Sequence, residues 1–240
     1  MLRAGASGGD ILTKKKFRPL RWLFRWWVRI VFLCTVAGFL LVGAGRWAIP
    51  PITHTQWAEQ QRLGGIARTW LPLDKTGEMA AAVIAAEDVE FCNHAGFDID
   101  AIRDALGDGR RRGASTLSQQ VAKNVYLWQD ASWLRKGLEA AITAVIELTW
   151  PKSRIIEVYL NVAETGTGVF GAEAAAQHWF GVRARDLSAQ QAAYIAAILP
   201  NPRGRSANPQ SNFIAERGRA IYGGMRIIAR DGRLDCLTEG

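Results

Sequence analysis

The chain has 240 residues, of which 49% are hydrophobic and 22% charged, and a formal net charge of +8 at pH 7. This composition is typical of a folded domain and excludes a disordered or collagen-like chain. Nine of the 30 Lys and Arg, and one of the 22 Asp and Glu, lie before residue 47, so the remainder carries 21 charges of each sign. Because the excess positive charge lies in the N-terminal part, we predict no cationic groove on the remainder and no nucleic-acid partner.

An uncharged stretch from Ile30 to Gly45 follows the basic N-terminus. With the flanking tryptophans it reaches about 20 residues, the length that crosses a bilayer. We predict a basic cytoplasmic arm over residues 1–29, a transmembrane helix over 30–49 and an extracytoplasmic domain over 50–240. The excess of basic residues before the span places the N-terminus in the cytoplasm. The alternative is a cleaved signal peptide, which the long apolar run and the absence of a small-x-small cleavage site disfavour.

The three cysteines and three histidines carry little information. Cys34 lies inside the predicted span, whereas Cys92 and Cys236 could pair in an oxidising compartment. Their spacing matches no disulfide framework, so two unpaired thiols are the expectation. No His-x-x-x-His or Cys-x-x-Cys pattern occurs, so no metal ligand is assigned.

Beyond Pro51 the sequence predicts helices separated by short Gly, Asp or Pro segments, without strand-length alternation. Thr116 with Gln119, and Ser188 with Gln191, have the spacing of capping boxes, which mark helix starts. The predicted fold class is therefore all-α, in one extracytoplasmic domain. The expected helices cover about 77–90, 99–106, 116–127, 132–150, 154–163, 172–180, 188–199 and 213–230.

Polar residues interrupt the helical pattern at three places. At the first, the apolar run 80–86 leads directly into Glu87 and Asp88. A carboxyl group at the end of an apolar run is a candidate for the raised pKa that a general base needs. The alternative is a solvated helix end, and the local sequence does not decide between them.

The second place is the polar helix start at residues 112–124. On a helix, Gln119 and Gln120 share a face with Lys123, which suits a sugar and a phosphate. The alternative is an exposed amphipathic helix with Leu117, Val121 and Val125 turned inward, which the local sequence alone favours.

The third place is the segment 132–150. A stripe at helical spacing predicts a buried face with Glu139 beside it and Arg135 one turn earlier. Glu147 falls on the far side and is expected to be solvated. By itself, an Arg135–Glu139 pair would be a surface ion pair worth a few tenths of a kcal/mol. The stripe consists of Leu134, Leu138, Ala141, Ile142, Val145 and Leu148.

Together these places resemble the motifs of the peptidoglycan glycosyltransferases, glycosyltransferase family 51. Residues 87–98 (EDVEFCNHAGFD) resemble E-D-x-x-F-x-x-H-x-G-x-D, and residues 113–124 (GASTLSQQVAKN) resemble G-[AG]-S-T-[IL]-[ST]-Q-Q-x-x-K-N. Residues 135–139 (RKGLE) resemble R-K-x-x-E, and two further blocks follow at 152–161 and 192–202. Five ordered motifs over about 87–202 are far more specific than any one of them.

The resemblance implies a lysozyme-like α-helical domain in the bacterial inner membrane that lengthens glycan strands from lipid II. It implies inversion at MurNAc C1 and release of undecaprenyl pyrophosphate. Glu87 and Glu139 are the implied catalytic residues, Glu87 as base and Glu139 as the group that orients cations and donor. The implied substrate contacts are Ser115, Gln119, Gln120, Lys123, Arg135 and Lys136.

The resemblance also sets expectations about cofactors and partners. No cofactor is required, although Mg or Mn at the pyrophosphate stays open. The expected partners are lipid II, the growing strand and the membrane, with cell-division or elongation proteins as candidates. No Ser-x-x-Lys nucleophile occurs, so no transpeptidase activity is expected. Gly107–Gly113 is expected to be a flexible basic segment whose arginines contact lipid headgroups, and the alternative is a solvated basic loop. The alternatives are a lytic peptidoglycan hydrolase and a cell-wall scaffold.

Overall fold

The computed structural model describes residues 19–100, 103 and 115–238. The chain divides into two units, Met1–Leu40 and Leu41–Gly240. The first contains most of helix α1 (Pro19–Ala44), in which Leu20–Ala44 is long and apolar enough to cross a membrane. This helix begins eleven residues before the start of the predicted span 30–49 and ends five residues before the end of that span. Most of the predicted helix 99–106 and the Gly107–Gly113 segment lie outside the described residues.

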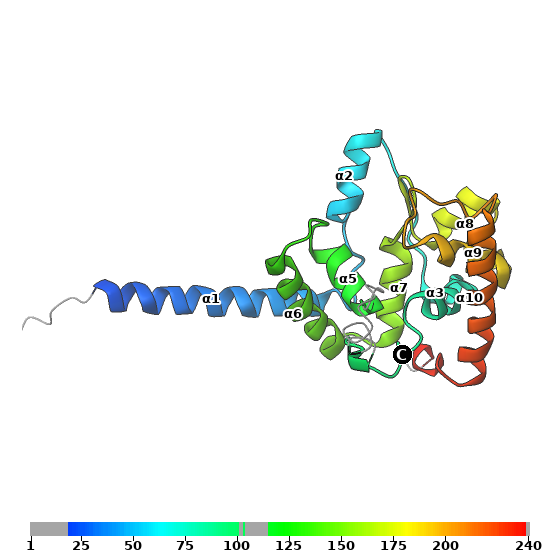
Figure 1. The fold of residues 1–240 in the computed structure, drawn as a ribbon. Coiled ribbons are helices and arrows are strands. Elements are labelled where there is room, and N and C mark those ends of the chain that lie inside the picture. The colour runs from blue at the N-terminus through cyan, green and yellow to red at the C-terminus, as the bar shows by residue number, and fades with distance from the viewer. Residues whose placement is uncertain (1–18, 101–102, 104–114, 239–240) are drawn as a thin grey trace, which may run out of the picture. The chain divides into compact units, whose positions relative to one another are not determined.

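The second unit is a helical domain (Figure 1). Seven of its helices correspond to predicted ones, and the structure confirms both predicted capping boxes, at Thr116 and Ser188. The sequence reading missed α2 (His54–Leu63), which begins with a capping box at Thr53. The other helices are α3 (Met79–Glu87), α5 (Leu117–Tyr126), α6 (Trp133–Thr149), α7 (Lys152–Val162), α8 (Ala172–Phe180), α9 (Ala189–Ile198) and α10 (Asn212–Arg230).

The core forms where α3, α9 and α10 pack against one another and α7 lies between α3 and α5. Every residue of α7 from Ile155 to Val162 except Glu157 is buried. Alanines that are wholly buried in α8 and α9 allow close approach of these helices. The described residues also form three one-turn 3-10 helices, η1 (Leu73–Lys75), η2 (Ala184–Asp186) and, after α10, η3 (Asp235–Leu237).

A small sheet lies beside these helices, in the order β1 (Ala67–Arg68), β3 (Val169–Phe170) and β2 (Glu164–Gly166). β1 is parallel to β3, and β2 is antiparallel to it. Gly168 has a φ of +70° in the turn between β2 and β3, which favours glycine. Strands of two or three residues are too short to produce alternation in the sequence. Because nearly all of the regular structure is helical, the domain is all-α, as predicted.

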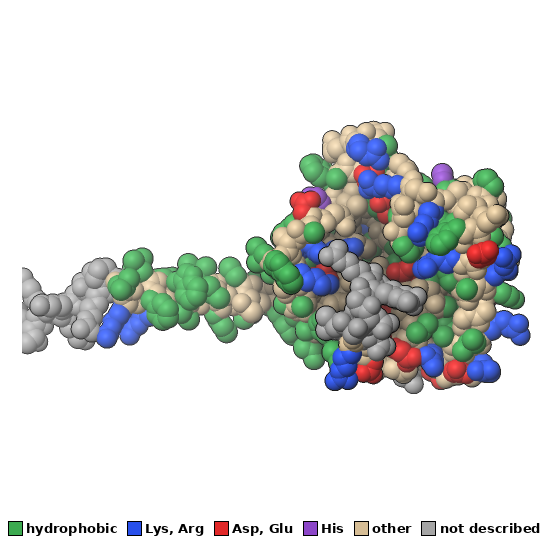
Figure 2. Space-filling view, in the orientation of Figure 1, with side chains coloured by type: hydrophobic (Ala, Val, Ile, Leu, Met, Phe, Trp, Pro, Cys, Tyr) green, Lys and Arg blue, Asp and Glu red, His purple; other side chains and the backbone are tan. Residues whose placement is uncertain are grey.

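The predicted buried face of α6 is buried only in part, because Ile142 and Val145 pack against the core but the two ends of the stripe are exposed. Leu134 and Leu148 are 70% and 79% exposed, whereas Glu139 is 2% exposed. Figure 2 shows apolar side chains gathered on the surface over α6. Glu147, expected to be solvated, forms an ion pair with Lys152 at 2.8 Å and accepts a hydrogen bond from the Ser118 hydroxyl. The carboxylates of α6 bond to Arg135 and Lys136 on the same helix, to Lys152 of α7 and to Ser118 of α5, while Leu134 and Leu148 stay exposed at the two ends of the stripe.

Residues Leu41–Ala48 belong to the domain unit and are bonded to it. The Trp150 indole donates to the Val42 carbonyl at 2.9 Å, and the Arg154 guanidinium donates to the carbonyls of Gly45 and Ala48. A Cβ at Gly45 would lie 2.5 Å from both the Trp150 ring and the Tyr126 hydroxyl. The end of the apolar helix is therefore part of the fold of the domain.

Cys92 and Cys236 form a disulfide across 144 residues of sequence, with Cα atoms 5.6 Å apart. The prediction of two unpaired thiols was wrong. Framework spacing is a signal in small disulfide-rich domains, and it is absent when one crosslink joins distant parts of a domain with its own core. Closing so long a loop stabilises the folded state by about 5 kcal/mol in the chain-entropy account.

We predict that Glu147→Ala lowers the free energy of unfolding by about 3 kcal/mol, because it leaves the Lys152 ammonium partly buried without its carboxylate. Urea unfolding followed by circular dichroism measures this. Glu216→Ala, at an exposed position of α10, is the control and should change stability by less than about 0.5 kcal/mol. Equal effects of the two substitutions would mean that Glu147 is solvated after all.

Candidate functional site

Glu87 is the last residue of α3, the helix whose apolar residues enter the core. The Gln120 side-chain amide donates to its carboxylate at 3.1 Å. Burial raises the pKa of the Glu87 carboxyl above its ordinary value, while the Gln120 hydrogen bond and the charges of Arg217 and Lys123 oppose the rise. Glu87 is thus a carboxylate with a raised pKa and one hydrogen bond, which suits proton transfer.

Asp88, the next residue, has a different environment. Its carboxylate accepts from the Leu117 backbone N–H at 2.9 Å and from His94 Nε2 at 2.8 Å. The Gly96 N–H donates to His94 Nδ1, so Nε2 carries the proton in this network. Asp88 therefore satisfies a free amide at the start of α5 and leaves Glu87 as the carboxylate of this pair that is available for chemistry.

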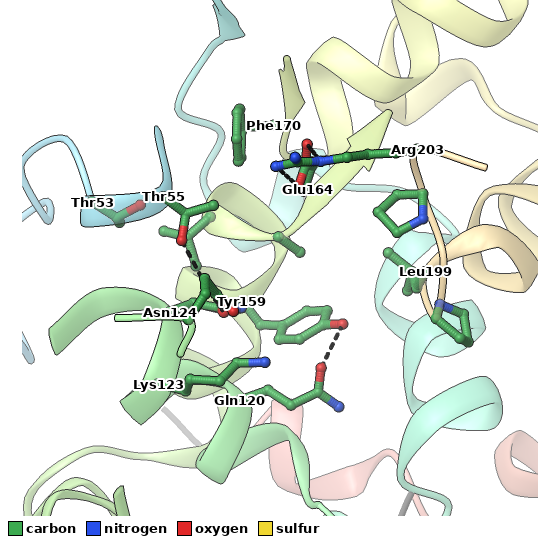
Figure 3. A pocket seen from close by; sticks show the side chains of 15 residues that line it. Thr53, Thr55, Gln120, Lys123, Asn124, Tyr159, Glu164, Phe170, Leu199 and Arg203 are labelled. Carbon is green, nitrogen blue, oxygen red and sulfur yellow. Dashed lines mark hydrogen bonds and ion pairs between the residues drawn. The ribbon is translucent and has the colours of Figure 1, made fainter. Parts of the chain in front are cut away.

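Gln120, on α5, uses both ends of its amide within the protein. Its nitrogen donates to Glu87, and its oxygen accepts from the Tyr159 hydroxyl at 3.3 Å (Figure 3). Burial and the nearby Glu87 charge raise the pKa of Tyr159 well above its ordinary value, so the hydroxyl keeps its proton. The resemblance implies that Gln120 contacts substrate, and in the structure its amide bonds to Glu87 and Tyr159 while its side chain also lines a cavity.

Gln119 serves the start of the same helix. Its side-chain oxygen accepts from the Thr116 N–H at 3.0 Å, and its own N–H donates to the Thr116 hydroxyl at 3.3 Å. This reciprocal capping box fixes the first turn of α5. The oxygen of Gln119 is thereby engaged, which leaves its amide nitrogen as the group that could reach a ligand.

Glu139 is buried between two cations on α6. The Arg135 guanidinium donates to one carboxylate oxygen at 2.6 Å, and the Lys136 ammonium donates to the other. Arg135 also donates from Nε to the Asp130 carbonyl at 2.8 Å. The local sequence suggested a weak surface pair, but a carboxylate 2% exposed cannot be left without its partners.

Lys123 lies between this group and Glu87. Its ammonium makes no hydrogen bond or ion pair with any residue of the described ranges. Burial lowers its pKa below the ordinary value, the Glu139 charge raises it, and the charges of Arg135 and Lys136 lower it. A partly buried cation that lacks a protein partner indicates an anionic ligand.

Two adjoining cavities meet at Gln120 and Lys123. The smaller, of about 120 Å³, is lined by Ser115, Gln119, Gln120, Lys123, Arg135, Lys136 and Glu139. Every predicted substrate contact thus lines one cavity, together with Glu139. Glu87 is connected to it through Gln120.

The larger cavity, of about 440 Å³, extends from Lys123 and Tyr159 toward Glu164 and Arg203 (Figure 3). Arg203 donates to Glu164 at 2.9 Å and forms an ion pair with Glu59 of α2 at 2.9 Å. The sequence reading missed this wall, because its residues come from α2, β2 and the segment after α9. Its signals in the sequence were Tyr159 in the fourth motif and Leu199, Pro200 and Pro202 in the fifth.

The sequence matches the family described as transglycosylase over residues 56–226. Three similar proteins are each named biosynthetic peptidoglycan transglycosylase. The protein of Jannaschia sp. (strain CCS1) is 52% identical over 218 residues, which are 90% of each chain. That of Rhodospirillum centenum is 50% identical over 81% of this chain and 87% of its own. That of Pseudomonas fluorescens (strain Pf-5) is 50% identical over 92% of this chain and 96% of its own.

We predict that Gln120→Ala raises the pKa of Glu87 further, because the substitution removes a hydrogen bond that favours the charged form. Titration of carbon-13-labelled glutamate carboxyls by NMR, with Glu87→Gln to assign the signal, measures this. Gln129→Ala, which removes a hydrogen bond to Thr55 and contacts no carboxylate, is the control and should leave the titration unchanged. A lower pKa in Gln120→Ala would contradict the assignment.

Proposed function

We propose a mechanism for this chain, which belongs to the transglycosylase family and is a peptidoglycan glycosyltransferase. In this proposal it lengthens glycan strands by transferring the growing strand onto lipid II. The observation that carries the proposal is the unequal environment of the two glutamates. Glu87 has a neutral hydrogen-bond partner, whereas Glu139 is held by two cations.

Glu87 acts as the general base. Its carboxylate takes the proton from the GlcNAc 4-hydroxyl of the acceptor lipid II as that oxygen attacks C1 of the MurNAc at the end of the donor strand. The new C1–O bond forms on the face opposite the leaving group, so the configuration at C1 inverts. Burial supports this role because it brings the pKa of Glu87 closer to neutrality and strengthens the base.

Lys123, Arg135 and Lys136 stabilise the leaving group. As the bond from C1 to the pyrophosphate oxygen breaks, the departing undecaprenyl pyrophosphate gains negative charge. Fixed cations that meet this charge lower the barrier without reorganising during the reaction. Glu139 orients Arg135 and Lys136, and Lys123, which has no partner in the described part of the chain, is the cation free to bind the ligand.

A divalent cation at the pyrophosphate does not fit the side chains of the smaller cavity as protein ligands. Mg²⁺ and Mn²⁺ prefer oxygen ligands, and both oxygens of Glu139 are bonded to cations. The described residues contain no cluster of three metal-ligating side chains. In our proposal the three cations therefore serve this role, and no step depends on a metal.

The larger cavity holds the growing glycan strand. It begins at Lys123 and Tyr159, beside the proposed leaving-group site, and ends at Arg203. Hydroxyl and amide groups from Thr55, Asn124 and Gln129 line it, as a sugar ligand requires. Its volume of about 440 Å³ lies in the range of small-molecule sites.

We place the N-terminus in the cytoplasm and the domain outside the inner membrane. The basic residues before the span support this orientation. The Cys92–Cys236 disulfide supports it independently, because disulfides persist in the periplasm and are rare in the cytosol. The exposed stripe of α6 gives the domain a lipid-facing surface, since the last residue of α6, Thr149, accepts a hydrogen bond from Arg46 near the end of the span.

We predict that position 148 contacts lipid. In a Cys34→Ser background, Leu148→Cys carrying a polarity-sensitive dye should be quenched by a quencher attached to lipid acyl chains in proteoliposomes. Ile227→Cys, at an apolar position of α10 that is 50% exposed, is the matched control and should not be quenched. Equal quenching at both positions would remove α6 as the lipid-facing surface.

The sequence left two other functions open, and no observation in the described part of the structure favours either. A lytic hydrolase of this fold would need two carboxyl groups, one of them protonated. Both oxygens of Glu139 are bonded to cations on its own helix, so this carboxylate is not free to serve as the second group. A scaffold for cell-division or elongation proteins would not require the buried cations, which cost free energy to maintain.

We predict that detergent-solubilised protein polymerises labelled lipid II, and that Glu87→Gln lowers the rate by at least about 10²-fold because it removes the base. Gel electrophoresis separates polymer from monomer, and Glu216→Gln is the control. Shortening of purified glycan strands without polymer formation would indicate the lytic function. If the folded protein does neither, the scaffold becomes the better explanation.

A further inference from the structure

The loop 88–96 connects Glu87 to the rest of the site. It contains no helix or strand, yet Phe91 is fully buried and Asp88 is 7% exposed. Asp88 and His94 bind each other, and the Lys152 ammonium donates to the His94 carbonyl at 2.7 Å. Because the loop lacks a backbone ladder, its shape depends on these side-chain contacts.

The C-terminal segment 233–236 makes two further contacts with the same loop. Arg233 forms an ion pair with Glu90, and Cys236 forms the disulfide with Cys92. Glu90 also accepts from the Asn93 side chain at 2.7 Å. One covalent and one ionic crosslink thus join the C-terminal segment to positions three and five residues after Glu87.

The C-terminal segment is itself held by the fold. The Arg233 N–H donates to the Ile228 carbonyl at 2.9 Å, which turns the chain back after α10. η3 packs against α7, and Leu234 and Leu237 pack against the core. The segment lies beyond residues 56–226, the part that matches the family. From there it reaches back to the first motif.

We propose that residues 233–236 are a positioning element for the catalytic centre, and that full transferase activity requires the Cys92–Cys236 disulfide. The crosslinks hold the loop 88–96, the loop holds Asp88 on the start of α5, and Asp88 fixes the end of α3 from which Glu87 projects. The proposal rests on the proposed role of Glu87.

Formation of the disulfide requires a partner that oxidises thiols. Closing the bond removes two protons and two electrons from the Cys92 and Cys236 thiols. A protein disulfide of the extracytoplasmic compartment accepts them: one cysteine thiolate attacks it, the second displaces the mixed disulfide, and a protein dithiol leaves. Maturation of the enzyme would therefore depend on a thiol oxidant located where the domain lies.

The test compares wild-type protein with the Cys92→Ser/Cys236→Ser variant, at a temperature where circular dichroism shows both folded. Hydrogen exchange of residues 88–96 should be faster in the variant, while exchange in α9 stays unchanged. The kcat for lipid II should fall by at least about tenfold with KM little changed, because small misplacements of a catalytic group are costly. Cys34→Ser is the matched control and should behave as wild type.

Two further measurements separate positioning from stability. Dithiothreitol should reproduce the loop exchange and the lower kcat in wild type, and oxidised glutathione should reverse both. Glu90→Arg should slow the enzyme, and the charge-exchanged pair Glu90→Arg/Arg233→Glu should recover activity. If the crosslink only stabilises the fold, its removal should lower the melting temperature and leave kcat and loop exchange unchanged.

The outcomes also distinguish this proposal from the proposed function. Faster loop exchange in the double serine variant supports the positioning element even if no protein form polymerises lipid II, which would count against the proposed function instead. Unchanged loop exchange overturns the positioning element, whatever the activity. Faster exchange with wild-type kcat overturns the requirement for the disulfide.

Discussion

The structure of the site depends on one constraint, which is that a buried carboxylate needs its charge neutralised. Glu139 is surrounded by protein and survives as an anion because Arg135 and Lys136 each bind one of its oxygens. The same contacts hold those two side chains at the cavity that Lys123 completes. The charges are arranged before any ligand arrives, so the free energy of that arrangement is spent in folding and not in catalysis.

The fold could be predicted from the sequence where local signals decide structure. The caps at Thr116 and Ser188 satisfy backbone amides within four residues, so they can be recognised without tertiary information. The helix α2 was missed because its mean hydropathy is low and it carries no apolar stripe. The site residues from the first three motifs were found through resemblance. Arg203 and Glu59 were not found, because contacts between distant segments leave no periodic signal.

The α6 helix shows why hydrophobic periodicity can predict a helix correctly and still predict wrongly which of its residues are buried. Hydrophobic periodicity identifies a face that avoids water, but it does not say whether protein or lipid covers that face. In a soluble protein Leu134 and Leu148 would enter the core. Here Glu139 and Glu147 have charged partners within the protein, and Leu134 and Leu148 are left outward. The sequence does contain the apolar span that precedes the domain. That span is the feature that would favour lipid over protein as the cover of this face.

The bonds at residues 42–48 mean that anchor and enzyme are not interchangeable modules. Trp150 and Arg154 donate hydrogen bonds to backbone carbonyls of the last helical turn and of the segment after it. Gly45 has no side chain, which leaves space for the Trp150 ring. These contacts fix the path of the backbone after Leu41. They place no requirement on the side chains before Leu41. An exchange of spans between such proteins would therefore have to be joined on the N-terminal side of Leu41, inside the apolar helix, and a joint at the domain boundary suggested by composition would cut through the folded structure.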